Sequence, residues 1–223
     1  MNETQYIDNF YSNPYEIIEK YADCDQPSPC PGSRSVKIDL QDKNFYNSFK
    51  DMIYNIHGLK DNPDWYFTTY FNLIPYYDEE ILNYNWPHID GDVRYDNTLN
   101  QSNYYDRMIL SGQIILSEIV DENLAARFWL PKSHLTEEQI FEKVLYGYIV
   151  NRDKYEKNEI TLEEYMKRYD EFHKDFVFHK KIDNVFNRMI SWKAGAIRGG
   201  LMVSKKQQWK LTQNFYVHKP TGR

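Results

Sequence analysis

Two histidines in the sequence are each followed two positions later by an aspartate, a spacing at which both side chains can ligate one metal ion. His88 and Asp90 form one pair, within the segment NWPHIDGD at residues 85–92, and His173 and Asp175 form the other. Six histidines and 33 acidic residues in 223 positions predict about one His-x-Asp/Glu pair by chance, as for any short motif. The sequence around each pair therefore decides which of them is a candidate site.

The pair at His173 and Asp175 lies in a predicted helix. Thr161 and Glu164 match a capping box, and aromatic residues follow at helical spacing as far as Phe176. Side chains two positions apart on a helix point in different directions. We therefore interpret this pair as part of a solvent-exposed helix face.

The pair at His88 and Asp90 lies in a predicted turn, after an aromatic and β-branched strand that ends near Ile74. Pro87 restrains the chain before the pair, and Gly91 gives it freedom afterwards. At a strand end, a histidine and a carboxylate two residues apart can turn toward the same point. With a distant histidine they would form the facial triad of a non-haem iron site, which leaves metal positions open for oxygen and a bidentate co-substrate.

Such a site also needs a cation for the far carboxylate of the co-substrate, and the last predicted strand, residues 209–217, supplies one. Side-chain alternation separates this segment into two faces. One face comprises Trp209, Leu211, Gln213, Phe215 and Val217, and the other, which is polar, comprises Lys210, Thr212, Asn214, Tyr216 and His218. The polar face is expected either to line a wet cavity or to lie exposed on the sheet. In the first case, Lys210 and Thr212 would hold that carboxylate.

The remaining elements determine how these residues would be positioned. Helices are expected within 1–60, where Asn13 and Pro14 begin one helix and Gly58 ends another. Strands are expected within 61–134 and 183–218, and capping boxes at Thr136 and Thr161 predict a helical insertion over 135–182. Because helices and strands do not alternate regularly, we predict one α+β domain over residues 1–223 with a strand-built core.

The order of these segments resembles that of the Fe(II)/2-oxoglutarate-dependent dioxygenase superfamily. The resemblance covers residues 5–218 and rests on HID at 88–90, RFWL at 127–130, NRMISWKAGAIRGG at 187–200 and KLT at 210–212. The loop PGSR at 31–34 is similar to that of a phage- and bacterium-encoded branch. The resemblance implies a double-stranded β-helix (jelly-roll, cupin-like) core, with N-terminal helices and a helical insertion. It also implies metal binding through His88 and Asp90, with Fe(II) and 2-oxoglutarate as cofactors. The implied oxidoreductase activity is hydroxylation of a small-molecule or peptide substrate.

One position departs from the family pattern. Arg198 lies where the family's distal histidine is expected, and a guanidinium stays protonated without a lone pair for iron. Iron could bind through His88 and Asp90 alone, with water or an outside group as the third ligand. Alternatively, the site is metal-free, and Arg198 pairs with Asp90 or with a ligand carboxylate. A third alternative is that another residue, such as His179 or His218, completes the triad.

These alternatives separate two classes of function. The chain is either an Fe(II)/2-oxoglutarate-dependent oxygenase or a metal-free protein that keeps the fold for binding or a structural role. Arg198 is a candidate co-substrate-binding residue together with Lys210 and Thr212, and it is the residue that distinguishes the two classes.

The composition limits the compartment and the partners. A net charge of −6 at pH 7 does not indicate nucleic-acid binding through phosphates. No stretch approaches the ~18 apolar residues of a membrane span, and the N-terminus lacks a signal-peptide pattern. Cys24 and Cys30 are too few for a disulfide framework or a zinc site. We expect a soluble cytoplasmic protein with reduced thiols and no membrane partner.

Overall fold

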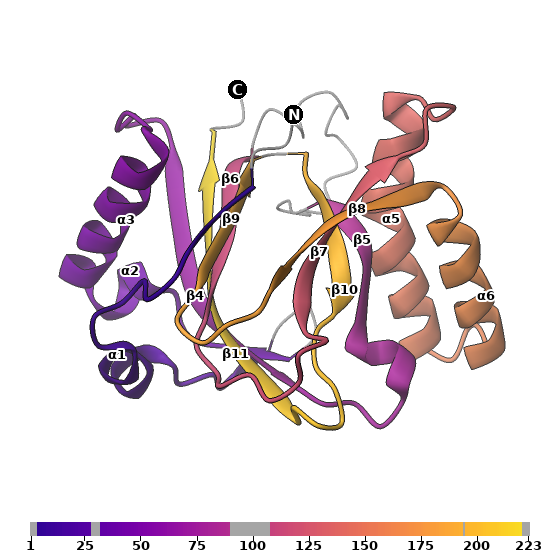
Figure 1. Ribbon diagram of the computed structural model, residues 1–223, viewed down its shortest axis with the longest axis horizontal. Helices are drawn as coiled ribbons and strands as arrows, with labels where there is room; N and C mark the ends of the chain where they lie inside the picture. The colour runs from indigo at the N-terminus through magenta and orange to yellow at the C-terminus, as the bar shows by residue number, and fades with distance from the viewer. Residues whose placement is uncertain (1–3, 28–31, 90–107, 194, 220–223) are drawn as a thin grey trace.

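Two antiparallel β-sheets face each other in the computed structural model, which describes residues 4–27, 32–89, 108–193 and 195–219 (Figure 1). The larger sheet has the order β1 (Thr4–Ile7), β9 (Met189–Lys193), β6 (Met108–Ile115), β11 (Trp209–His218), β4 (Tyr66–Pro75), β3 (Ser33–Arg34) and β2 (Gln26–Pro27). The smaller sheet has the order β5 (Tyr84–Ile89), β10 (Ile197–Leu201), β7 (Ala125–Pro131) and β8 (Phe176–Asp183). This is a jelly-roll arrangement, and it confirms the predicted α+β fold with a double-stranded β-helix core.

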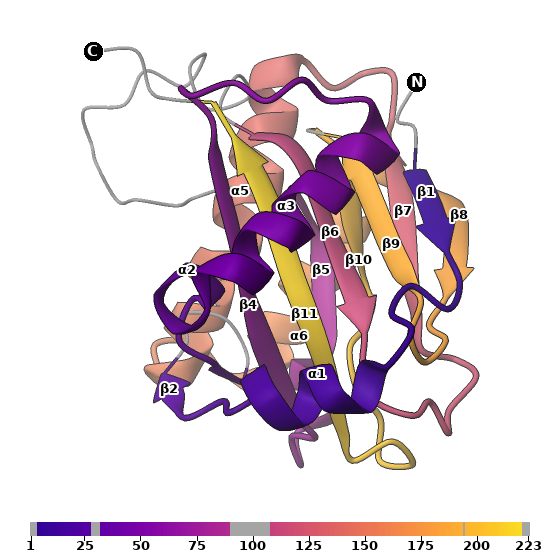
Figure 2. The same cartoon turned by 90° about the vertical axis from the view of Figure 1, so that its left-hand side faces the viewer.

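The N-terminal helices cover the outer face of the larger sheet (Figure 2). They are α1 (Pro14–Tyr21), α2 (Ile38–Gln41) and α3 (Lys43–His57). The Asn13 side chain accepts a hydrogen bond from the Glu16 N–H at the start of α1, as the sequence predicts. Helix α3 ends at Gly58, whose φ of 60° is left-handed, a conformation that favours glycine.

The core under these helices accounts for the two faces of β11. Leu211, Phe215 and Val217 pack in one apolar cluster with Phe49 and Ile53 of α3. The alternate residues of β11 therefore point to the other side of the larger sheet, toward the smaller sheet. Of the two expectations for this polar face, the one in which it lies exposed on the sheet surface is wrong.

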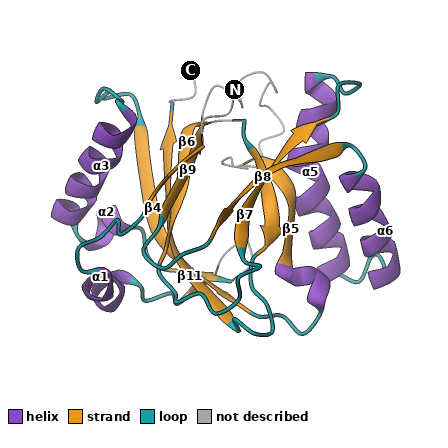
Figure 3. Ribbon diagram, in the orientation of Figure 1, coloured by secondary structure: helices purple, strands orange, loops and turns teal. Residues whose placement is uncertain are grey.

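A second pair of helices covers the outer face of the smaller sheet (Figures 1 and 3). Helix α5 (Glu137–Glu156) begins with the predicted capping box at Thr136, and α6 (Leu162–His173) begins where Thr161 accepts a hydrogen bond from the Glu164 N–H. Trp86 of β5 is fully buried in a cluster with Val144 of α5 and Tyr165 of α6. A 3₁₀ helix, η1 (Glu80–Asn83), leads into β5.

Three local predictions differ from the structure. Phe176 begins β8 and does not extend the preceding helix, because β8 pairs with β7 over its whole length. His173 is the last residue of α6 and is half-buried, with its ring 5.2 Å from that of Trp129, so it does not lie on a solvent-exposed face. His88 lies within strand β5 and not in a turn, because it pairs with β10.

The N-terminal region also contributes a strand, because β1 pairs with β9 at the edge of the larger sheet. No helix in the described ranges is long and apolar enough to cross a membrane.

Candidate functional site

The candidate site lies between the inner faces of the two sheets, and a bulge in β5 brings His88 to it. Arg198 of β10 pairs with His88, whereas Gly200 pairs with Asn85, so β5 contains one extra residue between these pairs. Trp86 consequently packs against α5 and α6, although it lies only two residues before His88. His88 and Arg198 are directly opposite in register and share one face of the smaller sheet.

The hydrogen bond of the His88 ring defines its tautomer. Nδ1 lies 2.8 Å from the carbonyl oxygen of Trp86, two residues earlier in the same strand. Because a carbonyl oxygen can only accept, Nδ1 carries the hydrogen. Nε2 of the neutral imidazole therefore has the lone pair, which is the usual state of a histidine that ligates a metal or accepts a hydrogen bond from a ligand.

Arg198 of the smaller sheet contacts the larger sheet. Its guanidinium carbon lies 4.6 Å from the ring centroid of Trp192, which belongs to β9 of the larger sheet. A guanidinium over an indole face is a favourable cation–π contact. Trp192 itself packs edge-on against Phe128 of β7 and is 2% exposed. The positive charge of Arg198 is therefore located on the inner side of the smaller sheet.

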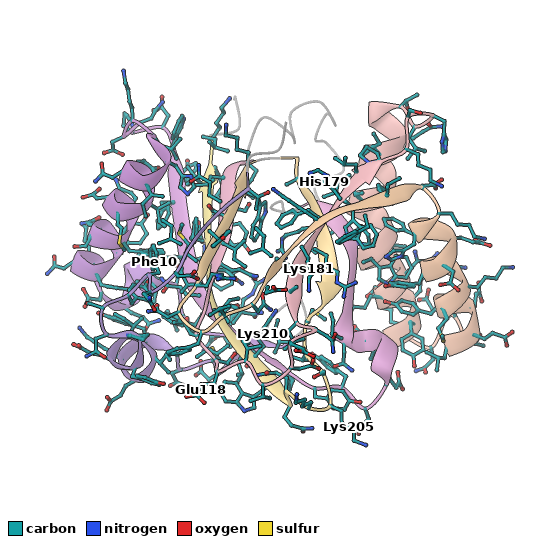
Figure 4. The ribbon with its side chains drawn as sticks, viewed as in Figure 1. Phe10, Glu118, His179, Lys181, Lys205 and Lys210 are labelled. Carbon is teal, nitrogen blue, oxygen red and sulfur yellow. The ribbon has the colours of Figure 1, made fainter. Side chains whose placement is uncertain are left out.

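Lys210 supplies a second positive charge from the facing sheet (Figure 4). Its side chain is buried, with 6% of the residue exposed. Within the described part of the chain its ammonium makes no hydrogen bond or ion pair. Burial and, second, the charge of Arg198 lower the pKa of Lys210 from its ordinary value of 10.5 to about 8.

Polar side chains continue along the same face beside Lys210. Thr212 is 2% exposed, and its hydroxyl donates to Oδ1 of Asn214 over 3.2 Å. Asn72 lies directly opposite Thr212 on β4, and its buried Oδ1 has no hydrogen-bond partner among the residues that the structure describes. Ser111 and Gln113 of β6 are also buried. The inner face of the larger sheet is therefore unusually polar for a region this well shielded from water.

Asn72 was not among the site residues predicted from the sequence, although the side-chain alternation of its strand identifies its face. Residues 67–73 alternate between side chains that pack against the helices, such as Phe67 and Phe71, and side chains of the opposite face, such as Tyr70 and Asn72. The same alternation that separated the two faces of β11 identifies Asn72 as an inner-face residue.

Two stacked tyrosine side chains, Tyr70 of β4 and Tyr216 of β11, lie on the same inner face. The rings of Tyr70 and Tyr216 stack with centroids 5.9 Å apart, and the Tyr70 hydroxyl donates to that of Tyr216 over 3.2 Å. The guanidinium carbon of Arg34 lies 4.4 Å from the Tyr70 ring centroid. These side chains form an aromatic border beside the polar face.

The described residues include only part of the three-ligand iron site that the family resemblance implies. Asp90 lies outside the described residues, so the structure gives no geometry for the His88–Asp90 pair. Across the described ranges, no three His, Cys, Asp or Glu side chains are grouped to hold a metal ion. The residue opposite His88 is Arg198, which cannot ligate iron. Of the other candidates, His179 is exposed on edge strand β8, and His218 is the last residue of β11.

The two facing antiparallel sheets, with helices on both outer faces, form a jelly-roll core (Figure 1). Among solved structures, the chain is similar to a prolyl-4-hydroxylase from Pseudomonas putida, with a TM-score of 0.50 and 13% sequence identity over 98% of this chain and 93% of that chain. At this identity the likeness concerns the fold alone. No protein-family model matches the sequence, and no curated protein matches it significantly.

Proposed function

We propose that this chain binds a small carboxylate-bearing molecule between its two sheets, and that positively charged side chains hold the ligand without a resident iron ion. The observation that carries the proposal is Lys210, a buried ammonium without a counterion within the described residues. Burying an unpaired charge costs several kcal/mol. An anionic ligand at Lys210 would remove most of that cost.

Arg198 supports an anion in the same place. Its charge lowers the pKa of Lys210, so these two cations of facing sheets repel each other. A ligand carboxylate between them would convert this repulsion into two favourable contacts. The guanidinium can also donate two parallel hydrogen bonds to one carboxylate, and its contact with Trp192 limits its motion before the ligand binds.

The neighbouring residues suggest a short ligand with further polar groups. Thr212 and Asn72 lie side by side on the larger sheet near Lys210, and His88 lies beside Arg198 on the smaller sheet. A dicarboxylate or 2-oxo acid matches this set of donors and acceptors. The fold supports 2-oxoglutarate as the first such molecule to test.

A second candidate function is that of an iron-dependent hydroxylase, with His88 and Asp90 as ligands and a small molecule or peptide as substrate. One observation favours it: the Nδ1 hydrogen bond of His88 to the Trp86 carbonyl is the kind of contact that orients a metal-ligating histidine. Arg198 opposite His88 is the observation against it.

Thermal unfolding with and without metal separates the two candidates. In EDTA, we expect 2-oxoglutarate and succinate each to raise the Tm of the wild-type chain, and Lys210→Met to abolish the increase. Lys205→Met is the matched control, since it removes the same charge from an exposed position. An increase that occurs only after Fe(II) is added under anaerobic conditions, with a metal-to-ligand charge-transfer band, would favour the hydroxylase and contradict our proposal.

A further inference from the structure

We propose that Lys210 forms a covalent imine with the carbonyl carbon of a 2-oxo acid bound between the sheets, an inference that rests on the carboxylate-binding function proposed above. In this reaction Lys210 acts as a nucleophile and not only as a cation that holds the carboxylate. Because an imine forms only at a carbonyl carbon, the ligand must be a carboxylate that also carries a ketone.

The surroundings of Lys210 favour a nucleophilic amine. Ile74 is directly opposite on β4 and packs in a buried cluster with Met202 and Val203, so this end of the inner face is partly apolar. In the described part of the chain, no carboxylate pairs with the ammonium and keeps it protonated. The charged group that acts on it is Arg198, which disfavours the ammonium form.

These surroundings change how much free amine is present. With a pKa of about 8, Lys210 is neutral in about one tenth of the molecules at pH 7, whereas an ordinary lysine is neutral in fewer than about one in a thousand. A desolvated lysine beside another cation is a recognised way to activate an amine for attack on a carbonyl. Arg198 remains protonated at any working pH.

The positions of the two side chains provide the orientation. Arg198 and Lys210 belong to strands of facing sheets, and Arg198 lies close enough to Lys210 for its charge to act on the ammonium. In a 2-oxo acid the ketone carbon is bonded directly to the carboxylate carbon. A ligand whose carboxylate pairs with Arg198 therefore has its ketone carbon one bond away from that contact, and imine formation requires the amine of Lys210, on the facing sheet, to reach that carbon.

The reaction is a condensation without oxidation or reduction. The lone pair of Nζ forms a C–N bond to the ketone carbon, the C=O π bond breaks, and a proton passes from nitrogen to oxygen to give a carbinolamine. The carbinolamine then loses its hydroxyl group together with the remaining N–H proton as water, and the nitrogen lone pair forms the C=N bond. The neutral amine and the 2-oxo acid thus give one imine and one water.

Reductive trapping tests the proposal directly on the wild-type chain. The protein is incubated with pyruvate or 2-oxoglutarate and sodium cyanoborohydride, and the modified lysine is located by peptide mass spectrometry. We expect one principal adduct, at Lys210, formed at least about tenfold faster than at exposed Lys205 because of the difference in free amine. Succinate, a dicarboxylate without a ketone, should slow the labelling of Lys210 and leave that of Lys205 unchanged.

Lys210→Arg separates the covalent step from binding. Arginine keeps the positive charge, so the variant should retain stabilisation by succinate but lose the principal adduct. Carboxylates that stabilise the wild-type chain without labelling Lys210 would refute the imine and leave the proposed function intact. If no carboxylate stabilises the chain and Lys210 is labelled no faster than Lys205, both proposals are wrong. If circular dichroism shows that Lys210→Arg is unfolded, the wild-type peptide map alone decides.

Discussion

Replacing Lys210 by methionine should stabilise the ligand-free protein. Lys210 has a folded-state pKa of about 8, against an ordinary value of 10.5 that we assign to the unfolded chain. A difference of about 2.5 pH units corresponds to about 3 kcal/mol of lost stability at neutral pH, at 1.36 kcal/mol per unit. Methionine has a similar length and no charge, so it fills the same space without this cost.

The pH dependence of the effect distinguishes it from a change in packing. Because the folded-state pKa is lowered, the unfolded state binds the extra proton between about pH 8 and 10.5. The destabilisation by Lys210 is therefore fully present below pH 8 and disappears as the pH rises toward 10.5. We expect the gain from Lys210→Met to be about 3 kcal/mol at pH 7 and below about 1 kcal/mol at pH 10.

Urea unfolding at the two pH values measures this gain. Lys205→Met, at an exposed position, should change the free energy of unfolding by no more than about 0.5 kcal/mol at either pH. If Lys210→Met is no more stable than the wild-type chain at pH 7, or if its gain is the same at pH 10, Lys210 is not a buried unpaired ammonium. The basis of the proposed carboxylate site would then be lost.

Three further substitutions test the site and the hydrogen bonds between Asn187 and the N-terminal segment. Arg198→His should increase Fe(II) affinity at least about tenfold, since it places an imidazole opposite His88; unchanged affinity in an anaerobic titration would show that position 198 is not the distal ligand position. Trp192→Leu removes the cation–π contact worth about 1 kcal/mol and should weaken succinate binding several-fold by calorimetry, whereas Trp209→Leu, at a half-exposed position, should not. Glycine at position 187 can adopt the φ of 59° that Asn187 has, but Asn187→Gly loses two buried hydrogen bonds between the Asn187 side chain and the backbone of Tyr11. We expect the substitution to lower the free energy of unfolding, measured in urea, by about 2 kcal/mol. An unchanged value would show that these two hydrogen bonds contribute little.

Local patterns were sufficient to predict where α1 and α5 begin and which residues share each face of the last strand. Asn13 and Thr136 cap their helices through hydrogen bonds to residues three positions later, so the signal lies within one turn of chain. The assignment of Lys210 and Thr212 to a common face follows from alternation within a single strand. The described structure confirms these features because nothing distant in the sequence competes with them.

Features that depend on pairing between distant strands could not be predicted in the same way. The bulge in β5 exists only relative to β10, more than 100 residues later, yet it determines that His88 and Trp86 face opposite sides of the sheet. Asn72 is adjacent to Thr212 only because β4 and β11 are paired. The sequence therefore indicated which residues could be functional, whereas the pairing of distant strands determined which of them lie together.

Proton linkage at Lys210 relates the two proposals and separates their pH dependence. Succinate binds best to the ammonium form, so its affinity should follow the protonated fraction and fall about tenfold between pH 7 and pH 9. Imine formation needs the neutral amine, and trapping by a 2-oxo acid should rise over the same interval. Arg198 holds its charge throughout, so the carboxylate contact does not change. If succinate affinity and 2-oxo acid trapping change in the same direction with pH, Lys210 acts on both ligands as a cation only. A buried amine with a pKa near 8 requires the two quantities to change in opposite directions.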